Sequence, residues 1–195
     1  MTGRDPKADL QMYLQDARDV LLWKLDGLSA YDQRRPVTPT GTSLLGLVKH
    51  LAGAEAFYLG AAFGRPFAGT PLSITGDAEP NADLWARADE TLEEITGLYR
   101  RACAHADATI AALPLDAVGR LPGDAGTELT LHHSLAHMIA ETQRHAGHAD
   151  IVRELIDGAT GQRSAGANTA EGDPAWWAAH RERVERAARE AGGPA

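Results

Sequence analysis

Cysteine, aromatic residues and strand-favouring patterns are scarce in this chain of 195 residues. The single cysteine, Cys103, excludes a disulfide framework within the chain and a four-cysteine zinc site. Aromatic residues make up 6% of the sequence, and β-branched residues are few while alanine is abundant. Together these shortages favour an all-α protein.

Positively charged residues are also fewer than negatively charged ones. The chain has 19 Lys and Arg residues against 27 Asp and Glu residues, a formal net charge of −8. Nucleic-acid binding needs a basic surface, so we expect no nucleic-acid partner. No run approaches the roughly 18 apolar residues that cross a bilayer, and no secretory signal is visible. We therefore expect no membrane partner and a cytoplasmic protein.

Apolar residues recur every three or four positions in several segments, which is typical of amphipathic helices. We predict a single domain over residues 1–195, a four-helix bundle with its core at about 7–158 and a C-terminal strap and short helix at 159–195. Loops are expected at Tyr31–Pro39, Pro66–Pro80 and Gly158–Asp173, with a turn-rich connection at Gly119–Glu128. The predicted helices span about Lys7–Leu28, Leu44–Gly64, Ala82–Leu113, Thr130–Asp157 and Pro174–Ala191, the last docked by Trp176 and Trp177.

Histidine is concentrated in the fourth predicted helix. Successive residues of a helix are rotated by about 100°, so His145 lies about 40° from Glu141, His148 about 20° and His137 about 40° on the other side. These four side chains therefore share one face of the helix. A face exposed only to solvent would favour Lys, Glu and Arg instead.

The spacing of these residues indicates a metal site. Glu141 and His145 are four residues apart, so both can reach one cation. His50, a polar residue on an otherwise apolar face of the second predicted helix, is the candidate third ligand. Two histidines and one carboxylate leave positions open, as in catalytic sites for zinc, nickel, iron or manganese, with zinc favoured. Spacing alone leaves His137 and His148 as alternatives to Glu141.

Other candidate residues carry weaker signals. Trp176 and Trp177 are expected to anchor the last helix and to line a cofactor pocket, and Arg153 to form an ion pair or bind an anion. Cys103 is expected to be unreactive within the third helix.

Three segments resemble the DinB-like superfamily, and more narrowly its actinobacterial "mini-circle" type branch of unknown function. The resemblance covers about residues 9–161 and is most specific in the fourth predicted helix. The segments read LVKHLAG (47–53), FGRP (63–66) and ETQRHAGHADIVRELIDG (141–158).

The resemblance implies a bundle with an up-down-down-up course and one divalent metal ion. Most members of the superfamily use three histidines as ligands, whereas the chain has Glu141 at one of those positions. That set resembles the two histidines and one glutamate of the mycothiol-dependent maleylpyruvate isomerase. Carried over, the ligands are His50, Glu141 and His145, while His148 takes the place of a glutamine beside the site.

The superfamily includes S-transferases that use mycothiol or bacillithiol. The resemblance therefore implies a metal-dependent enzyme that transfers a mycothiol-type thiol to a small electrophile, with His148 and His137 as catalytic residues. Two alternatives are a hydrolase or tailoring enzyme that uses metal-bound water, and a non-catalytic stress protein that binds a ligand or metal. A homodimer is also expected, because dimers are common in this fold.

Overall fold

The chain folds as a helical bundle, which confirms the predicted all-α class. The computed structural model describes residues 5–69, 79–123, 126–162, 170 and 172–192. Four long helices form the bundle, and shorter elements connect or follow them. The long helices are α1 (Pro6–Trp23), α3 (Leu44–Tyr58), α4 (Leu92–Ala112) and α5 (Leu131–Asp157); the others are α2 (Ala30–Arg34), the 3₁₀ turn η1 (Ala61–Phe63), strands β1 (Val118–Arg120) and β2 (Glu128–Thr130), and helix α6 (Pro174–Gly192).

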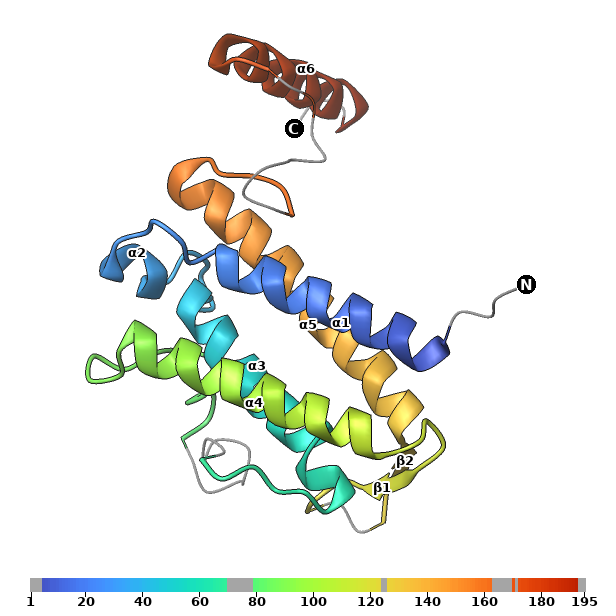
Figure 1. Ribbon diagram of the computed structural model, residues 1–195. Helices are drawn as coiled ribbons and strands as arrows, with labels where there is room; N and C mark the ends of the chain where they lie inside the picture. Colours follow the sequence, from blue (N-terminus) through green and yellow to red (C-terminus); the bar gives the residue numbers. More distant parts are fainter. Residues whose placement is uncertain (1–4, 70–78, 124–125, 163–169, 171, 193–195) are drawn as a thin grey trace.

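The four long helices run up, down, down and up, as predicted (Figure 1). Helix α1 packs along α5, and α3 packs along α4 and also contacts α5. Because α3 and α4 run in the same direction, the chain between them must return along the whole length of the bundle. Residues 59–69 and 79–91 of this connection are described, residues 84–85 lie against α3, and most of the predicted loop at Pro66–Pro80 lies outside the described residues.

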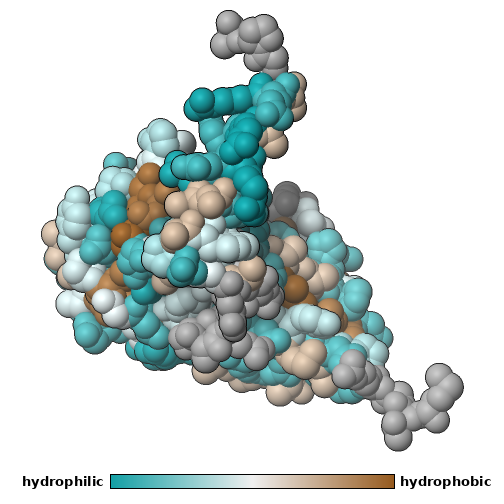
Figure 2. All heavy atoms as spheres, turned by 90° about the horizontal axis from the view of Figure 1, so that it is seen from above, coloured by the Kyte–Doolittle hydropathy of each residue, from teal (hydrophilic) through white to brown (hydrophobic). Residues whose placement is uncertain are grey.

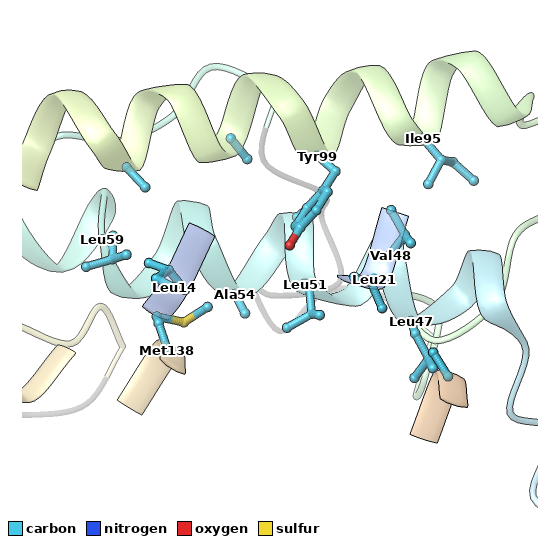
Figure 3. Close-up of a cluster of buried hydrophobic side chains, with 14 of the residues drawn as sticks. Leu14, Leu21, Leu47, Val48, Leu51, Ala54, Leu59, Ile95, Tyr99 and Met138 are labelled. Carbon is cyan, nitrogen blue, oxygen red and sulfur yellow. The ribbon is translucent and has the colours of Figure 1, made fainter. Parts of the chain in front are cut away.

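A continuous apolar core lies between the helices (Figure 3). Leu14 and Leu21 of α1, Leu51 of α3, Tyr99 of α4 and Met138 of α5 are each no more than 1% exposed. Full burial of one such side chain contributes about 1.5–3 kcal/mol. This core fixes the spacing of α3 and α5, the two helices that carry the histidine cluster.

One buried ion pair interrupts the apolar core. Arg18 of α1 donates two hydrogen bonds to the Glu55 carboxylate of α3, at 2.7 and 2.8 Å, and both side chains are buried. Burial alone would lower the pKa of the Arg18 guanidinium, but the hydrogen bonds and charge of Glu55 raise it above its ordinary value. A third bond, to Asp107 of α4, ties three helices together.

The predicted first helix is too long. Helix α1 ends at Trp23, and Gly27 follows in a left-handed conformation with φ of 74°. A second short helix, α2, then begins where Ser29 caps the backbone N–H of Asp32. The prediction of a loop from Tyr31 to Pro39 is therefore wrong over the first four of those residues.

The predicted third helix starts ten residues too early. Residues 82–91 form turns, and α4 begins at Leu92. Thr91 and Glu94 form a reciprocal capping box at that point, because each side chain bonds the other residue's backbone N–H.

A small antiparallel hairpin occupies the region predicted as turn-rich. Strands β1 and β2 pair Gly119 with Leu129. A Cβ atom at Gly119 would lie 2.5 Å from the Ala62 carbonyl oxygen and 2.9 Å from the Phe63 ring. The absence of a side chain therefore lets the hairpin pack directly on η1.

Helix α6 contributes nothing to the core. None of its residues is buried, and Trp176 and Trp177 remain 39% and 38% exposed. The structure therefore does not show the predicted docking by these indoles, although the helix itself matches the predicted range to within one residue. The view from above shows a largely hydrophilic surface with separate hydrophobic patches (Figure 2). Within the described residues, no helix has the length and apolarity needed to span a membrane.

Candidate metal centre

Helices α3 and α5 bring three ligand-type side chains together. Helix α5 matches the predicted segment closely: the Thr130 side chain caps its start, and Gly158 ends it in a left-handed conformation. Helix α3 begins at the Ser43 cap, as predicted. Because the two helices pack together, His50 of α3 faces Glu141 and His145 of α5.

One carboxylate oxygen links the two histidines. Glu141 Oε1 lies 3.0 Å from His145 Nε2 and 3.4 Å from His50 Nε2. The imidazole rings meet edge to face, with centroids 5.0 Å apart. The three side chains keep 12–24% of their surface exposed, so a small molecule can reach the cluster from solvent.

The local electrostatics favour the forms that bind a metal ion. Partial burial acts to raise the pKa of the Glu141 carboxyl, but hydrogen bonds and charge from His50 and His145 outweigh it and lower that pKa. Partial burial and the nearby His50 lower the pKa of His145, although Glu141 opposes them. At neutral pH the carboxylate and the neutral imidazole therefore prevail, and these are the ligating forms.

The outer nitrogen of each histidine has its own partner. His50 Nδ1 lies 2.6 Å from Asp83 Oδ2, and His145 Nδ1 lies 3.3 Å from His148 Nδ1. When both Nδ1 atoms carry the hydrogen, both Nε2 lone pairs face Glu141 Oε1. Three acceptor atoms turned towards one another need a cation or proton between them.

The donor set fits a single divalent cation. A zinc ion with ligand bonds of about 2.0–2.2 Å holds neighbouring tetrahedral ligands roughly 3.4 Å apart. The contacts of 3.0 and 3.4 Å are close to this spacing, and all three ligand atoms lie within 4.8 Å of one another. Two histidines and one carboxylate would leave at least one coordination position for a substrate.

The two proposed catalytic histidines lie on the same face of α5 but in different surroundings. His148 contacts His145, with ring centroids 5.3 Å apart, and is exposed. His137 is partly buried, and its ring packs on Tyr58 of α3 with centroids 4.3 Å apart. Neither is among the three residues whose ligand atoms converge.

Arg153 lies about 12 Å farther along α5 than His145. Its Nη1 donates to the carbonyl oxygens of Lys24 and Asp26, just after α1, and its other nitrogens bond the Asp157 carboxylate. The structure thus shows a connection between two helices, and anion binding by Arg153 stays a prediction.

Trp176 and Trp177 lie in a different part of the molecule from the cluster. The two rings contact each other and His180 of the same helix. Trp177 also lines a cavity of about 870 Å³ with Asp150, Glu154, Gly158 and residues 160–162. A binding role for the two indoles stays a prediction, and of the two only Trp177 lines this cavity.

Cys103 is a poor nucleophile, as expected. It is partly exposed on α4, and burial of the sulfur raises the pKa of its thiol. The thiol form is therefore favoured at neutral pH.

Asp83, the partner of His50, was missed by sequence reasoning. The predicted third helix included it, although the true start of that helix is marked by the capping-box pattern from Thr91 to Glu94. The dipeptide Pro80-Asn81 also favours a turn, and Asn81 adopts a φ of 64°. Those two signals place Asp83 in an irregular segment, where an acidic side chain is free to meet a neighbouring helix.

The fold and the cluster together define a helical bundle with one candidate metal site between two of its helices. A family model described as mycothiol-S-transferase matches residues 9–158. The chain belongs to this family, and hence to the DinB-like superfamily that it resembles. No curated protein matches the chain.

Proposed function

We propose that this protein is a metal-dependent S-transferase that joins a mycothiol-type thiol to a small electrophile. The observation that carries the proposal is the convergence of His50, Glu141 and His145 on one point. Family membership supports thiol transfer and a small-molecule substrate. The proposal adds the metal dependence and the assignment of its ligands.

His50, Glu141 and His145 would hold the metal ion. A divalent cation in such a site lowers the pKa of a thiol and so supplies a nucleophile at neutral pH. The chain's own residues set the conditions for this. The α3–α5 packing fixes the ligands, and their partial exposure leaves room for a thiol and an electrophile.

His148 is proposed to receive the thiol proton. In the overall reaction, a sulfur–carbon bond forms, the leaving group departs from the electrophile and the thiol loses its proton. His148 is exposed and touches His145, so it can pass that proton to solvent. His137, whose ring packs on Tyr58 at an interplanar angle of 46°, would form an aromatic wall against which the substrate lies.

The proposal is tested by metal content together with thiol-dependent activity. We expect about one equivalent of zinc in the parent protein and none in His145→Ala, measured by elemental mass spectrometry. His132→Ala is the matched control, because His132 is exposed at the start of the same helix and outside the cluster.

Activity is followed with a bimane halide, whose fluorescence rises as the thioether forms. We expect the parent and His132→Ala to accelerate the reaction with mycothiol, and His145→Ala to leave the uncatalysed rate. A metal-loaded protein that ignores thiols but cleaves an ester would favour the hydrolase alternative. A protein that binds no metal after reconstitution would contradict the proposal.

A further inference from the structure

The segment from Glu79 to Glu90, between α3 and α4, touches the histidine cluster. Its only described side-chain contact with the cluster is Asp83, whose Oδ2 lies 2.6 Å from His50 Nδ1. Both side chains are partly buried, at 19% and 24% exposure. The contact is therefore sheltered, and it is short enough for a strong charge-assisted hydrogen bond.

Helix α3 holds this segment at two points near His50. A Cβ atom at Gly46 would overlap the Leu84 carbonyl oxygen, so glycine allows the backbone after Asp83 to touch the helix. One turn later, Lys49 Nζ donates to the Trp85 carbonyl at 3.1 Å and to the Glu90 carboxylate at 2.8 Å. Lys49 is almost buried, so both bonds are shielded from water.

This anchoring determines which nitrogen of His50 carries the hydrogen. Carboxylates face both ring nitrogens, but Asp83 lies 2.6 Å from Nδ1 whereas Glu141 lies 3.4 Å from Nε2, so the tautomer with the hydrogen on Nδ1 is favoured. The Nε2 lone pair then points at Glu141. Without Asp83, Glu141 is the carboxylate left at the ring, so the hydrogen is expected on Nε2, and that tautomer cannot bind a metal through Nε2.

We propose that Asp83 is a positioning residue that fixes the ring and tautomer of His50 for metal binding, held in place by Gly46 and Lys49. The proposal rests on the proposed function for the metal itself. The part of the proposal that concerns the tautomer of His50 can be tested in the metal-free protein. Partners of this kind typically contribute 10–100-fold to metal affinity.

The first test is the ¹H–¹⁵N spectrum of the histidine side chains in the metal-free protein. We expect His50 to carry its hydrogen on Nδ1 in the parent and to shift towards the Nε2 form in Asp83→Ala. Asp83→Asn retains an acceptor oxygen and is expected to keep most of the Nδ1 form. A purely structural role for Asp83 would not produce this graded change.

The second test is zinc affinity, measured by competition with a chelating dye. We expect Asp83→Ala to bind zinc about 10–100-fold more weakly than the parent, with Asp83→Asn between them. Asp89→Asn is the matched control, because Asp89 is an exposed carboxylate of the same turn region that pairs with Arg87 and not with the cluster in the part of the chain that the structure describes.

The outcomes separate this proposal from the proposed function. A parent protein with His50 in the Nε2 form, or Asp83→Ala with unchanged tautomer and zinc affinity, overturns the role of Asp83 even if zinc binds. A parent protein that binds no zinc contradicts the proposed function, while the expected tautomer shift would still support the contact between Asp83 and His50.

Discussion

Glu141 is the residue on which the candidate site depends most. Its Oε1 atom is shared by two imidazoles from different helices, so it both supplies a ligand and compensates the charge of a cation. A neutral side chain of the same shape would keep the packing but lose this charge. Glu141→Gln therefore separates the ligand role from the structural role.

We expect Glu141→Gln to weaken zinc binding by more than the roughly 10–100-fold that an orienting partner contributes, because it removes a ligand charge. The free energy of unfolding of the metal-free protein should change little, since the side chain is 24% exposed. Dye competition and urea denaturation measure the two quantities. Zinc affinity within a factor of three of the parent would rule out Glu141 as a ligand.

The buried pair of Arg18 and Glu55 makes a second residue-scale prediction, about stability. Glu55→Gln leaves the Arg18 charge without its main partner, and breaking a buried pair in this way costs about 3–5 kcal/mol. Asp107→Asn is the matched control, because the Asp107 side chain is 37% exposed and its loss leaves both bonds to Glu55. We expect it to cost no more than about 1 kcal/mol. Urea denaturation that gives equal losses for the two variants would contradict this account.

At the scale of elements, two glycines should respond in opposite directions to the same substitution. Gly147 of α5 has nothing within 4 Å of a Cβ atom, so Gly147→Ala should stabilise the helix by up to about 1 kcal/mol. Gly46 of α3 meets the Leu84 carbonyl, so Gly46→Ala should lower the thermal midpoint despite its better helix propensity. Scanning calorimetry compares the two, and a stabilised Gly46→Ala would show that the segment after Asp83 is not held there.

The junction between α5 and the end of α1 should be sensitive to acid. The hydrogen bonds from Arg153 lower the pKa of the Asp157 carboxyl below its ordinary value. The ionised form therefore stabilises the fold fully above the pKa of the unfolded chain, and this stabilisation is lost as pH falls through the lower, folded-state pKa. We expect Asp157→Asn to reduce the thermal midpoint at pH 6 and to make little difference at pH 2.5. A difference that stays constant across that range would contradict the assignment.

The ends of a helix were predicted accurately where capping residues next to those ends were recognised in the sequence. Helix α5 was predicted almost to the residue, because Thr130 and Gly158 mark its ends in the sequence itself. The starts of α2 and α4 were missed because an apolar period continued past Gly27 and before Thr91, and the caps at Ser29 and Thr91 were overlooked. The contact between Asp83 and His50 depends on how a long connection packs on α3, which periodicity does not reveal.

At the scale of the whole molecule, the bundle and the last helix behave as separate parts. The family match ends at residue 158, and none of the residues of α6 is buried. The chain just after α5 is bonded to the end of α1 without help from α6. Trp23 Nε1 donates to the Gln162 carbonyl, and Lys24 Nζ donates to the Gly161 carbonyl. The candidate metal site therefore needs nothing beyond this point.

A chain that ends at Gly172 should keep the free energy of unfolding within about 0.5 kcal/mol of the parent, together with the parent's zinc affinity. If Trp176 and Trp177 bind the thiol, the same truncation raises KM for the thiol and leaves kcat unchanged, and Trp176→Ala/Trp177→Ala in the full chain reproduces that effect. An unchanged KM would remove both indoles from the binding surface. A lower thermal midpoint would show that α6 packs on the bundle in solution more closely than in the structure, where none of its residues is buried.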